Sequence, residues 1–138
     1  YVDIYKNDDL SSARIAASIE ANASVVRNLM SKLKKAGLLN NQPGVARASL
    51  AKPASEISVL DVYRAITSTA SLLHVDPKTN PNCVVGANIQ NRLEEVYQRV
   101  QNAAELEMSQ ISIQDVIDGV LESERLKQKA GGDGEKLD

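Results

Sequence analysis

Several residue types are scarce or missing in this chain of 138 residues. It has no Phe and no Trp, four Tyr are its only aromatic residues, and it has one Cys and one His. Because β-sheets are rich in aromatic and β-branched residues, the lack of aromatics favours a core of packed helices. A single Cys excludes an intramolecular disulfide, and one Cys with one His cannot supply the ligands of a structural zinc site.

Long apolar runs and catalytic motifs are missing as well. The sequence has no apolar run of about 18 residues, so nothing predicts a membrane span. It starts with Tyr1 and shows no basic and apolar leader, so we expect a cytoplasmic protein without membrane contact, and residues 1–5 as the last part of a helix. No nucleophile with a base, phosphate-binding loop or metal motif is visible, and we therefore expect no enzymatic activity.

Acidic residues are scarce in one part of the chain and abundant in another. From Ser11 to Ser55 the sequence has seven basic residues and one acidic residue, whereas from Gly86 to Asp138 it has six basic and eleven acidic residues. The formal net charge of -2 hides this asymmetry. Because a basic surface attracts a polyanion, we expect nucleic acid to contact the first of these segments.

Two short helices and a hairpin are predicted in the basic segment. Ser11 and Ser12 are good N-caps for a first helix, and residues 23–36 have the apolar spacing of a second helix that ends at Gly37. So short a break between two helices is typical of a helix-turn-helix. Turn-forming residues then precede residues 45–50, which can return as a strand, and this predicts a β-hairpin wing.

The second predicted helix has a polar face opposite its apolar stripe. Arg27 can donate two bonds to guanine and Asn28 can pair with adenine, whereas Ser and Lys side chains hold phosphates. The alternative is an ordinary solvated face, but the charge of the segment favours DNA. Arg47, on the predicted hairpin, is a candidate for a minor-groove or phosphate contact, or else a surface arginine without a role. The predicted DNA-binding residues are Ser24, Arg27, Asn28, Ser31, Lys32, Lys35 and Arg47.

A long helix is predicted from Gly86 to Ser109. Its apolar residues recur at alternating spacings of four and three, as in a coiled-coil seam. The helix either packs only against its own domain or pairs with the same helix of a second copy. We favour pairing, because two-fold symmetry matches a palindromic DNA site. The predicted dimerisation residues are Ile89, Leu93, Val96, Val100 and Ala103.

The expected fold is thus mainly α with a small β-hairpin wing. Residues 1–67 are predicted to form a winged helix-turn-helix DNA-binding region, and 68–85 a loop. The dimerisation helices are expected at 86–125, and a disordered tail at 126–138.

Four segments carry a further pattern: Ile15-Ala-Ala-Ser-Ile, Val25-Val-Arg-Asn-Leu-Met-Ser-Lys-Leu-Lys-Lys-Ala-Gly-Leu-Leu, Leu50-Ala-Lys-Pro, and Ile57-Ser-Val-Leu-Asp-Val-Tyr-Arg-Ala-Ile. Together they resemble the BadM/Rrf-two family of bacterial transcriptional regulators, which includes the IscR, NsrR and CymR types. The resemblance covers nearly the whole chain. It implies a dimeric winged-helix repressor that contacts DNA through the recognition helix and the wing. The stretch Asn80-Pro-Asn-Cys-Val-Val-Gly resembles the cluster-free YwnA-like branch.

Two departures from the family pattern bear on the cofactor and the wing. Iron-sulfur members have three cysteines in the loop before the long helix, but here Cys83 matches only the last, and Ser71 and Pro77 stand about where the others would be. Neither binds iron as a thiolate does, so we expect no iron-sulfur cluster and no other cofactor. The family's Arg-Gly-Pro-Gly-Gly-Gly-Tyr run appears as Gln42-Pro-Gly-Val-Ala-Arg-Ala, which leaves Arg47 as a substitute for the wing arginine.

Cys83 has two interpretations. A cysteine at a helix start can have a lowered pKa and be oxidised to a sulfenic acid or to a disulfide across a dimer. The alternative, which we favour, is a small buried residue at the helix start.

These patterns predict a sequence-specific transcriptional regulator, a repressor that binds a pseudo-palindromic operator in double-stranded DNA as a homodimer. The alternative is a winged-helix adaptor that docks a protein partner without specific DNA binding.

Overall fold

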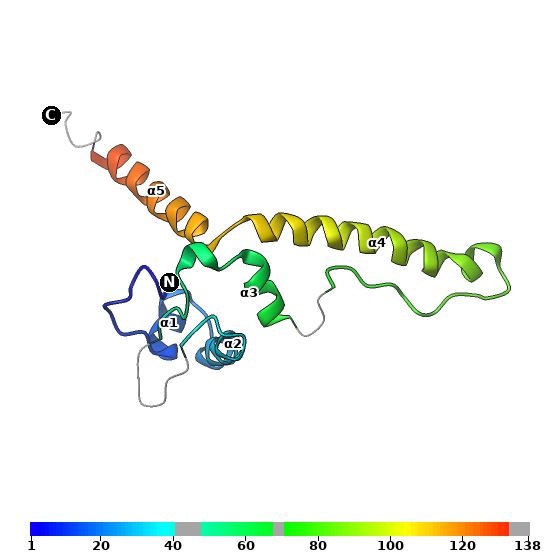
Figure 1. Ribbon diagram of the computed structural model, residues 1–138, viewed down its shortest axis with the longest axis horizontal. Coiled ribbons are helices and arrows are strands. Elements are labelled where there is room, and N and C mark those ends of the chain that lie inside the picture. Colours follow the sequence, from blue (N-terminus) through cyan, green and yellow to red (C-terminus); the bar gives the residue numbers. More distant parts are fainter. Residues whose placement is uncertain (41–47, 68–70, 133–138) are drawn as a thin grey trace.

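The computed structural model describes residues 1–40, 48–67 and 71–132, and its regular structure is almost entirely helical. Helices α1, α2 and α3 gather on one side of the molecule, α4 extends away from them, and α5 projects in another direction (Figure 1). The prediction of a mainly helical fold is confirmed. The elements in chain order are α1 (Ser12–Ser18), α2 (Ala23–Lys35), the 3-10 turn η1 (Ala54–Glu56), α3 (Val59–Ile66), α4 (Val84–Gln110) and α5 (Ile113–Gly132).

The first two helices begin at capping side chains. Ser11 Oγ accepts a hydrogen bond from the backbone of Arg14 at 3.3 Å, and Asn22 Oδ1 accepts one from the backbone of Ser24 at 2.8 Å. These bonds satisfy amide groups that have no partner inside the helix. Helix α2 ends before Gly37, whose φ of 74° is the left-handed conformation that glycine adopts most readily.

A small aliphatic core joins α1 to α2. Ile15 and Ala16 of α1 pack with Val26 of α2, and all three side chains are buried. Tyr1 and Val2 cover this cluster from the N-terminal side. Residues 2–7 form turns in place of the helix end that we expected. This core contacts one face of α2, and the opposite face of the helix points to solvent.

The expected wing falls mostly on residues 41–47, which lie outside the described residues, and Arg47 lies among them. On either side of that stretch, Leu39 and Leu50 form an isolated antiparallel bridge, and the backbone of Asn40 donates to the carbonyl of Ser49 at 2.9 Å. Antiparallel backbone pairing is what the stem of a hairpin requires. The bridge is compatible with a wing, but it does not by itself establish one.

Helices α3 and α5 begin side by side. Ser58 and Ser112 lie opposite each other in an isolated antiparallel bridge. The backbone of Val59 donates to the carbonyl of Ile111 at 2.8 Å, and a second bond of 2.8 Å, donated by Ile113, completes the pair. These backbone bonds join the start of α3 to the end of α4 and to the start of α5.

The segment 71–83 returns along α4, as Figure 1 shows. The backbone of Leu72 donates to Gln101 Oε1 at 2.7 Å, and Thr79 Oγ1 donates to the carbonyl of Gly86 at 2.6 Å. The later loop residue thus contacts the earlier helix residue, so the loop runs antiparallel to α4. A loop followed by a long helix was predicted, and the helix begins two residues earlier than expected, at Val84.

Helix α5 is longer than predicted, because it runs to Gly132. Residues 126–132 of the expected disordered tail are therefore helical, which is a correction, and residues 133–138 lie outside the described part. Leu126 to Ala130 are good helix formers that extend a helix already started, which accounts for the difference. Neither α5 nor any other helix in the described ranges is long and apolar enough to cross a membrane.

Candidate nucleic-acid interface

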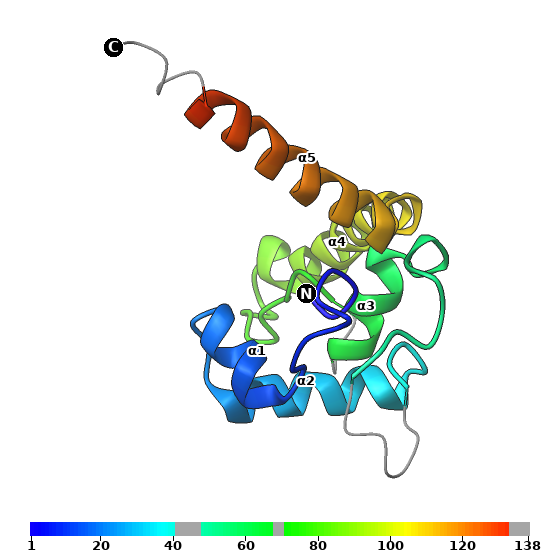
Figure 2. The same ribbon diagram turned by 90° about the vertical axis from the view of Figure 1, so that its left-hand side faces the viewer.

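Helix α2 presents the predicted polar face to solvent. Figure 2 shows α2 at the end of the molecule opposite α5, with α1 packed across it. Its inward side carries Val26, which is only 4% exposed. The structure brings six of the seven predicted DNA-binding residues together on this exposed helix, and the seventh, Arg47, lies outside the described residues. The exposed six are Ser24, Arg27, Asn28, Ser31, Lys32 and Lys35.

Two contacts set the geometry of this face. Arg27 Nη2 donates to Ser24 Oγ at 3.2 Å, so the guanidinium is held along the outer side of the first turns of α2. Lys32 Nζ donates to the carbonyl of Ile66 at 3.5 Å, a long bond to the last residue of α3. Arg27 therefore lies on the outer side of α2, and its role in DNA binding stays a prediction, whereas Lys32 also joins α2 to α3, a contact that the sequence did not reveal.

The positive charge of α2 is not neutralised by ion pairs within the described residues. The ion pairs there join Arg64 to Glu105, Arg92 to Glu95, and Arg125 to Glu122, and they lie on α3, α4 and α5. Helix α2 has no acidic residue in its first turn, and Lys32, Lys34 and Lys35 stand in its last turn. Unpaired cations on an exposed helix can replace the counterions of a phosphate backbone.

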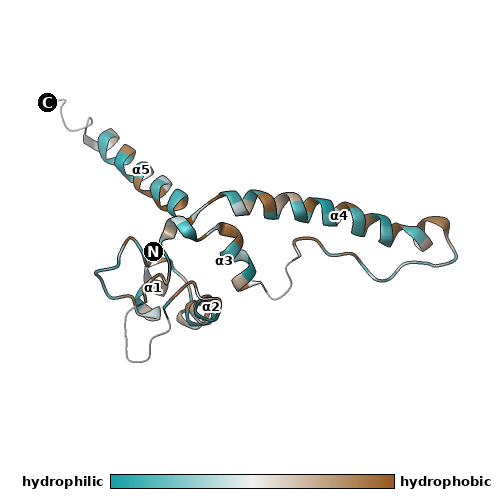
Figure 3. Ribbon diagram, in the orientation of Figure 1, coloured by the Kyte–Doolittle hydropathy of each residue, from teal (hydrophilic) through white to brown (hydrophobic). Residues whose placement is uncertain are grey.

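Helix α4 has one covered face and one open apolar face. Tyr97, Ala104 and Met108 are half-buried on the side that packs against α3. On the predicted seam, Val96 and Val100 are 50% and 47% exposed. Figure 3 shows apolar residues recurring along α4 between polar ones. Of the other predicted seam residues, Ala103 is exposed, and Ile89 and Leu93 are half-buried.

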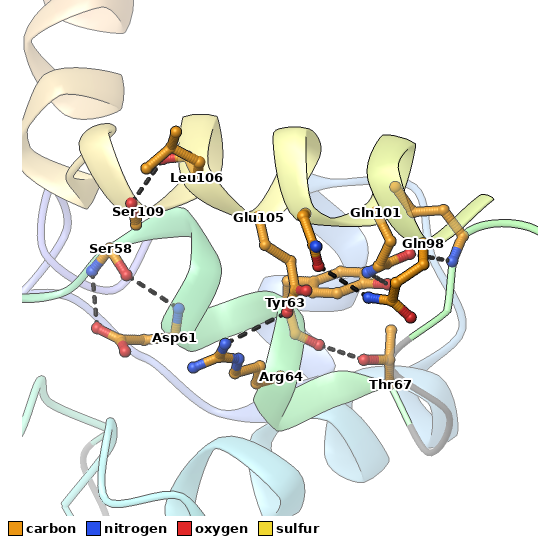
Figure 4. Close-up of polar contacts among 12 residues, drawn as sticks. Ser58, Asp61, Tyr63, Arg64, Thr67, Gln98, Gln101, Glu105, Leu106 and Ser109 are labelled. Atoms are coloured by element: carbon orange, nitrogen blue, oxygen red, sulfur yellow. Dashed lines mark hydrogen bonds and ion pairs between the residues drawn. The ribbon is translucent and has the colours of Figure 1, made fainter. Parts of the chain in front are cut away.

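A polar cluster that sequence reasoning missed joins α3 to α4 (Figure 4). Gln101 is only 7% exposed, and its Nε2 donates to the hydroxyl of Tyr63 at 3.3 Å. Beside it, Arg64 pairs with Glu105 at 3.3 Å. The sequence contains one signal for Gln101, since it is a polar residue on the same face of α4 as the half-buried residues Tyr97, Ala104 and Met108.

Cys83 is exposed, which corrects the favoured interpretation of a small buried residue. It is the N-cap of α4, where the backbone amides of Gly86 and Val85 favour the thiolate and lower the pKa of its thiol. The turn before Cys83 lies close to the start of α4. A Cβ at Gly86 would lie only 2.1 Å from the carbonyl oxygen of Asn80. A thiol in this position has more thiolate character than a free cysteine.

Comparison with known proteins identifies the family of the chain. The family model described as Rrf2, Iron-dependent Transcriptional regulator, matches residues 2–119. The chain belongs to the Rrf2 family. This is the family that the motifs around α1, α2 and α3 resemble, and its description is that of a transcriptional regulator rather than of an enzyme. As an Rrf2 family member, the chain is a transcriptional regulator.

Individual relatives agree with this assignment. The chain is similar to YwnA of Bacillus subtilis (strain 168), a candidate HTH-type transcriptional regulator, with 43% identity over 83% of this chain and 86% of YwnA. It is also similar to a solved structure described as a candidate DNA-binding protein, with 41% identity, a TM-score of 0.65, and coverage of 81% and 87% of the two chains. A candidate regulator from Lactobacillus plantarum shares the fold alone, with 20% identity, a TM-score of 0.72, and coverage of 96% and 91%.

The family description includes iron, so the donor set of this Rrf2 chain matters. Iron-sulfur clusters are held mainly by several cysteine thiolates, and this chain has Cys83 alone. Among residues 1–40, 48–67 and 71–132, no three His, Cys, Asp or Glu side chains come together as metal ligands. The donors of one chain therefore do not fit an iron site of this kind, and the absence of a cofactor stays a prediction.

Proposed function

We propose that this chain is a DNA-binding repressor that acts as a homodimer and places α2 of each copy on a pseudo-palindromic operator. The observation that carries the proposal is the exposed cationic face of α2, which forms no ion pair with any of the described residues. We place its action in the cytoplasm, with the DNA. The likeness to YwnA and to a candidate DNA-binding protein supports the same function.

The residues near the start of α2 are assigned to base recognition. In a helix-turn-helix, the N-terminal residues of the second helix reach the base edges in the major groove. Arg27 has the bidentate geometry for guanine, and Asn28 that for adenine. Ser24 accepts a hydrogen bond from Arg27 and so limits the rotamers of that guanidinium before DNA arrives. Ordering the side chain in advance lowers the entropy lost on binding.

The residues farther along α2 are assigned to the phosphate backbone. Ser31 and Lys35 are exposed and follow the base-reading residues along the same helix. Lys32 is shared between DNA and the carbonyl of Ile66, because its bond to that carbonyl is long and exposed. We further propose that residues 41–47 form the wing and that Arg47 contacts the minor groove or a phosphate.

The open face of α4 is proposed as the dimer interface. At about 100° per residue, the seam residues Val96 and Val100 lie roughly 140° and roughly 100° around the helix from Gln101, which faces α3. One helix can therefore pack on its own domain and on a second copy at once. Two half-exposed valines on one helix face are costly in a monomer, and pairing removes them from water.

The test begins with DNA selection. Purified protein is mixed with random duplexes, and the retained fragments are sequenced and measured at several salt concentrations. We expect an inverted repeat, and an affinity that falls on the order of 10³-fold between about 50 and 200 mM salt, because several phosphate contacts release counterions. A flat salt dependence would contradict the proposal.

Charge reversal separates this surface from general electrostatics. Arg27→Glu should abolish binding to the selected sequence and leave the dimer intact. Lys127→Glu on α5 makes the same charge change outside the proposed surface and should bind within about three-fold of the unmodified chain. Equal losses in both variants would sink the assignment to α2. A dimer that retains no DNA fragment at all would favour the protein adaptor.

A further inference from the structure

A cavity of about 480 Å³ lies between the segment 71–75 and helix α4. This volume falls in the range of small-molecule sites. Its helical wall is formed by residues that share one face of α4, from Glu94 through Gln101 to Glu105, and its other wall includes Leu73 and His74. We refer to it as the α4 cavity. It lies on the face of α4 next to the proposed dimer seam, because its wall residue Tyr97 is only about 40° around the helix from the seam residue Leu93.

The charge of the α4 cavity is negative at one end. Glu105 is paired with Arg64 at 3.3 Å, so its charge is compensated. Glu94 takes part in none of the ion pairs found among the described residues, although its neighbour Glu95 pairs with Arg92 at 3.1 Å. A carboxylate at a cavity wall attracts a cation, and the attraction strengthens where the ligand excludes water.

The remaining walls combine apolar and amide groups. Leu73 is 41% exposed on the loop side, and Val75 and Tyr97 add further apolar surface. Gln101 lines the cavity and is almost fully buried, and each of its amide atoms makes one hydrogen bond, to Leu72 and to Tyr63. An amide oxygen has a second lone pair, which can accept a bond from a ligand N–H. The walls thus suit a short aliphatic chain with a cationic head.

We propose that the α4 cavity binds a small aliphatic ammonium or guanidinium compound, with its cation at Glu94. We also propose that its occupancy changes the affinity of α2 for DNA, a second step that rests on the proposed function. No cluster of metal-ligating side chains lies within the described residues, so an organic cation is the class that the site favours.

The contacts around the cavity supply the connection to α2. Gln101 holds Tyr63, and Glu105 holds Arg64, so two residues of the cavity wall bind α3 (Figure 4). Helix α3 packs against α2, and its last carbonyl, that of Ile66, accepts the bond from Lys32. A ligand that shifts the loop against Gln101 therefore acts on the helix that supports the DNA-binding face.

Binding is tested on the whole chain by thermal unfolding with millimolar butylamine or agmatine, and with 1-butanol and butyrate as matched neutral and anionic probes. We expect the cationic probes alone to raise Tm, by about 3 °C. Glu94→Gln should abolish the rise, and Glu95→Gln, its exposed neighbour in an ion pair, should retain it. The proposed site is overturned if no cationic probe acts selectively, or if the two variants respond alike.

Coupling is tested separately, with the DNA fragment retained in the selection. We expect a cationic probe that binds to change the DNA dissociation constant by about five-fold or more, and to leave it unchanged in Glu94→Gln. Binding without this change would overturn the coupling and leave the cavity site standing. If the chain retains no DNA, the proposed function fails, while thermal unfolding still decides whether the cavity binds a cation.

Discussion

Ser58 and Ser112 face each other across one antiparallel bridge, and each opens a helix with the same capping box. Asp61 N donates to Ser58 Oγ, and Asp115 N to Ser112 Oγ, both at 3.0 Å. The two aspartates accept the return bonds from the backbone of the serines, both at 2.9 Å. Because this bridge joins the first residues of α3 and α5, it fixes the direction of α5 relative to α3, the helix that packs against α2.

Removing one of these caps should weaken the whole fold. Ser112→Ala deletes the acceptor for the backbone of Asp115, and we expect the free energy of unfolding to fall by about 1 kcal/mol in a urea titration. Ser123→Ala, in the exposed middle of α5, is the matched control and should change it by less than about 0.5 kcal/mol. If both variants unfold at the same urea concentration, the capping box contributes no measurable stability.

Ser24 should matter to DNA binding through Arg27. Ser24→Ala removes the acceptor that orients the guanidinium, and we expect a loss of about three-fold in affinity for the selected operator. Arg27→Ala alone should cost about 1–3 kcal/mol. In the Arg27→Ala background, the Ser24 substitution should have little further effect. Additive losses in this double-mutant cycle would mean that Ser24 acts on DNA independently.

The seam on α4 should control the oligomeric state. Val96→Glu and Val100→Glu each place a charge in the proposed apolar interface, and we expect light scattering to show a monomer with greatly weakened operator binding. Asn102→Glu adds a charge on a different face of the same helix and should leave the dimer intact. A dimer that survives both valine substitutions would show that the seam is not the interface.

The thiol of Cys83 should react faster in the folded chain than in the unfolded chain. Its pKa is lowered by the backbone amides of Gly86 and Val85, so at a given pH the folded chain has a larger thiolate fraction than the unfolded chain. We expect iodoacetamide to label the native protein faster than the urea-unfolded protein at pH 7. The midpoint of the rate profile should move to higher pH on unfolding. The reverse order would show that the N-cap geometry does not stabilise the thiolate.

Iron should not be needed by this regulator. Because Cys83 is its single cysteine, we expect the purified protein to contain iron only at background level by elemental analysis and to show no visible absorbance from a cluster. Chelator treatment should leave operator binding unchanged. Stoichiometric iron, or a loss of binding after chelation, would point to ligands from a second copy or another molecule.

The fold could be predicted mainly where one local signal decides the structure. Each such signal lies within a few residues of the helix that it predicts. Examples are the caps at Ser11 and Ser58, the helix end at Gly37, and the alternating spacing of four and three along α4. The end of α5 was harder, because Gly131 and Gly132 are poor helix formers and make this stretch resemble a disordered tail. Helix propensity extends a helix that has already nucleated, and a composition argument does not include that cooperativity.

The candidate site was predictable in its residues and less so in its contacts. The exposed face of α2 follows from helical spacing alone, since apolar residues define the side that turns inward. The bond between Lys32 and Ile66 depends on how α3 packs against α2, and no local pattern encodes that distance. Cys83 shows the same limit, because its exposure depends on how the loop returns along α4.

The close approach of Gly86 to Asn80 has a mechanical consequence. A side chain at position 86 would collide with the backbone of the turn, and the carbonyl of Gly86 also accepts a bond from Thr79. These contacts therefore attach the turn at residues 79–86 to the start of α4. Any hinge that lets the loop open must therefore lie before Thr79. Such an opening would displace the part of the loop that covers Gln101.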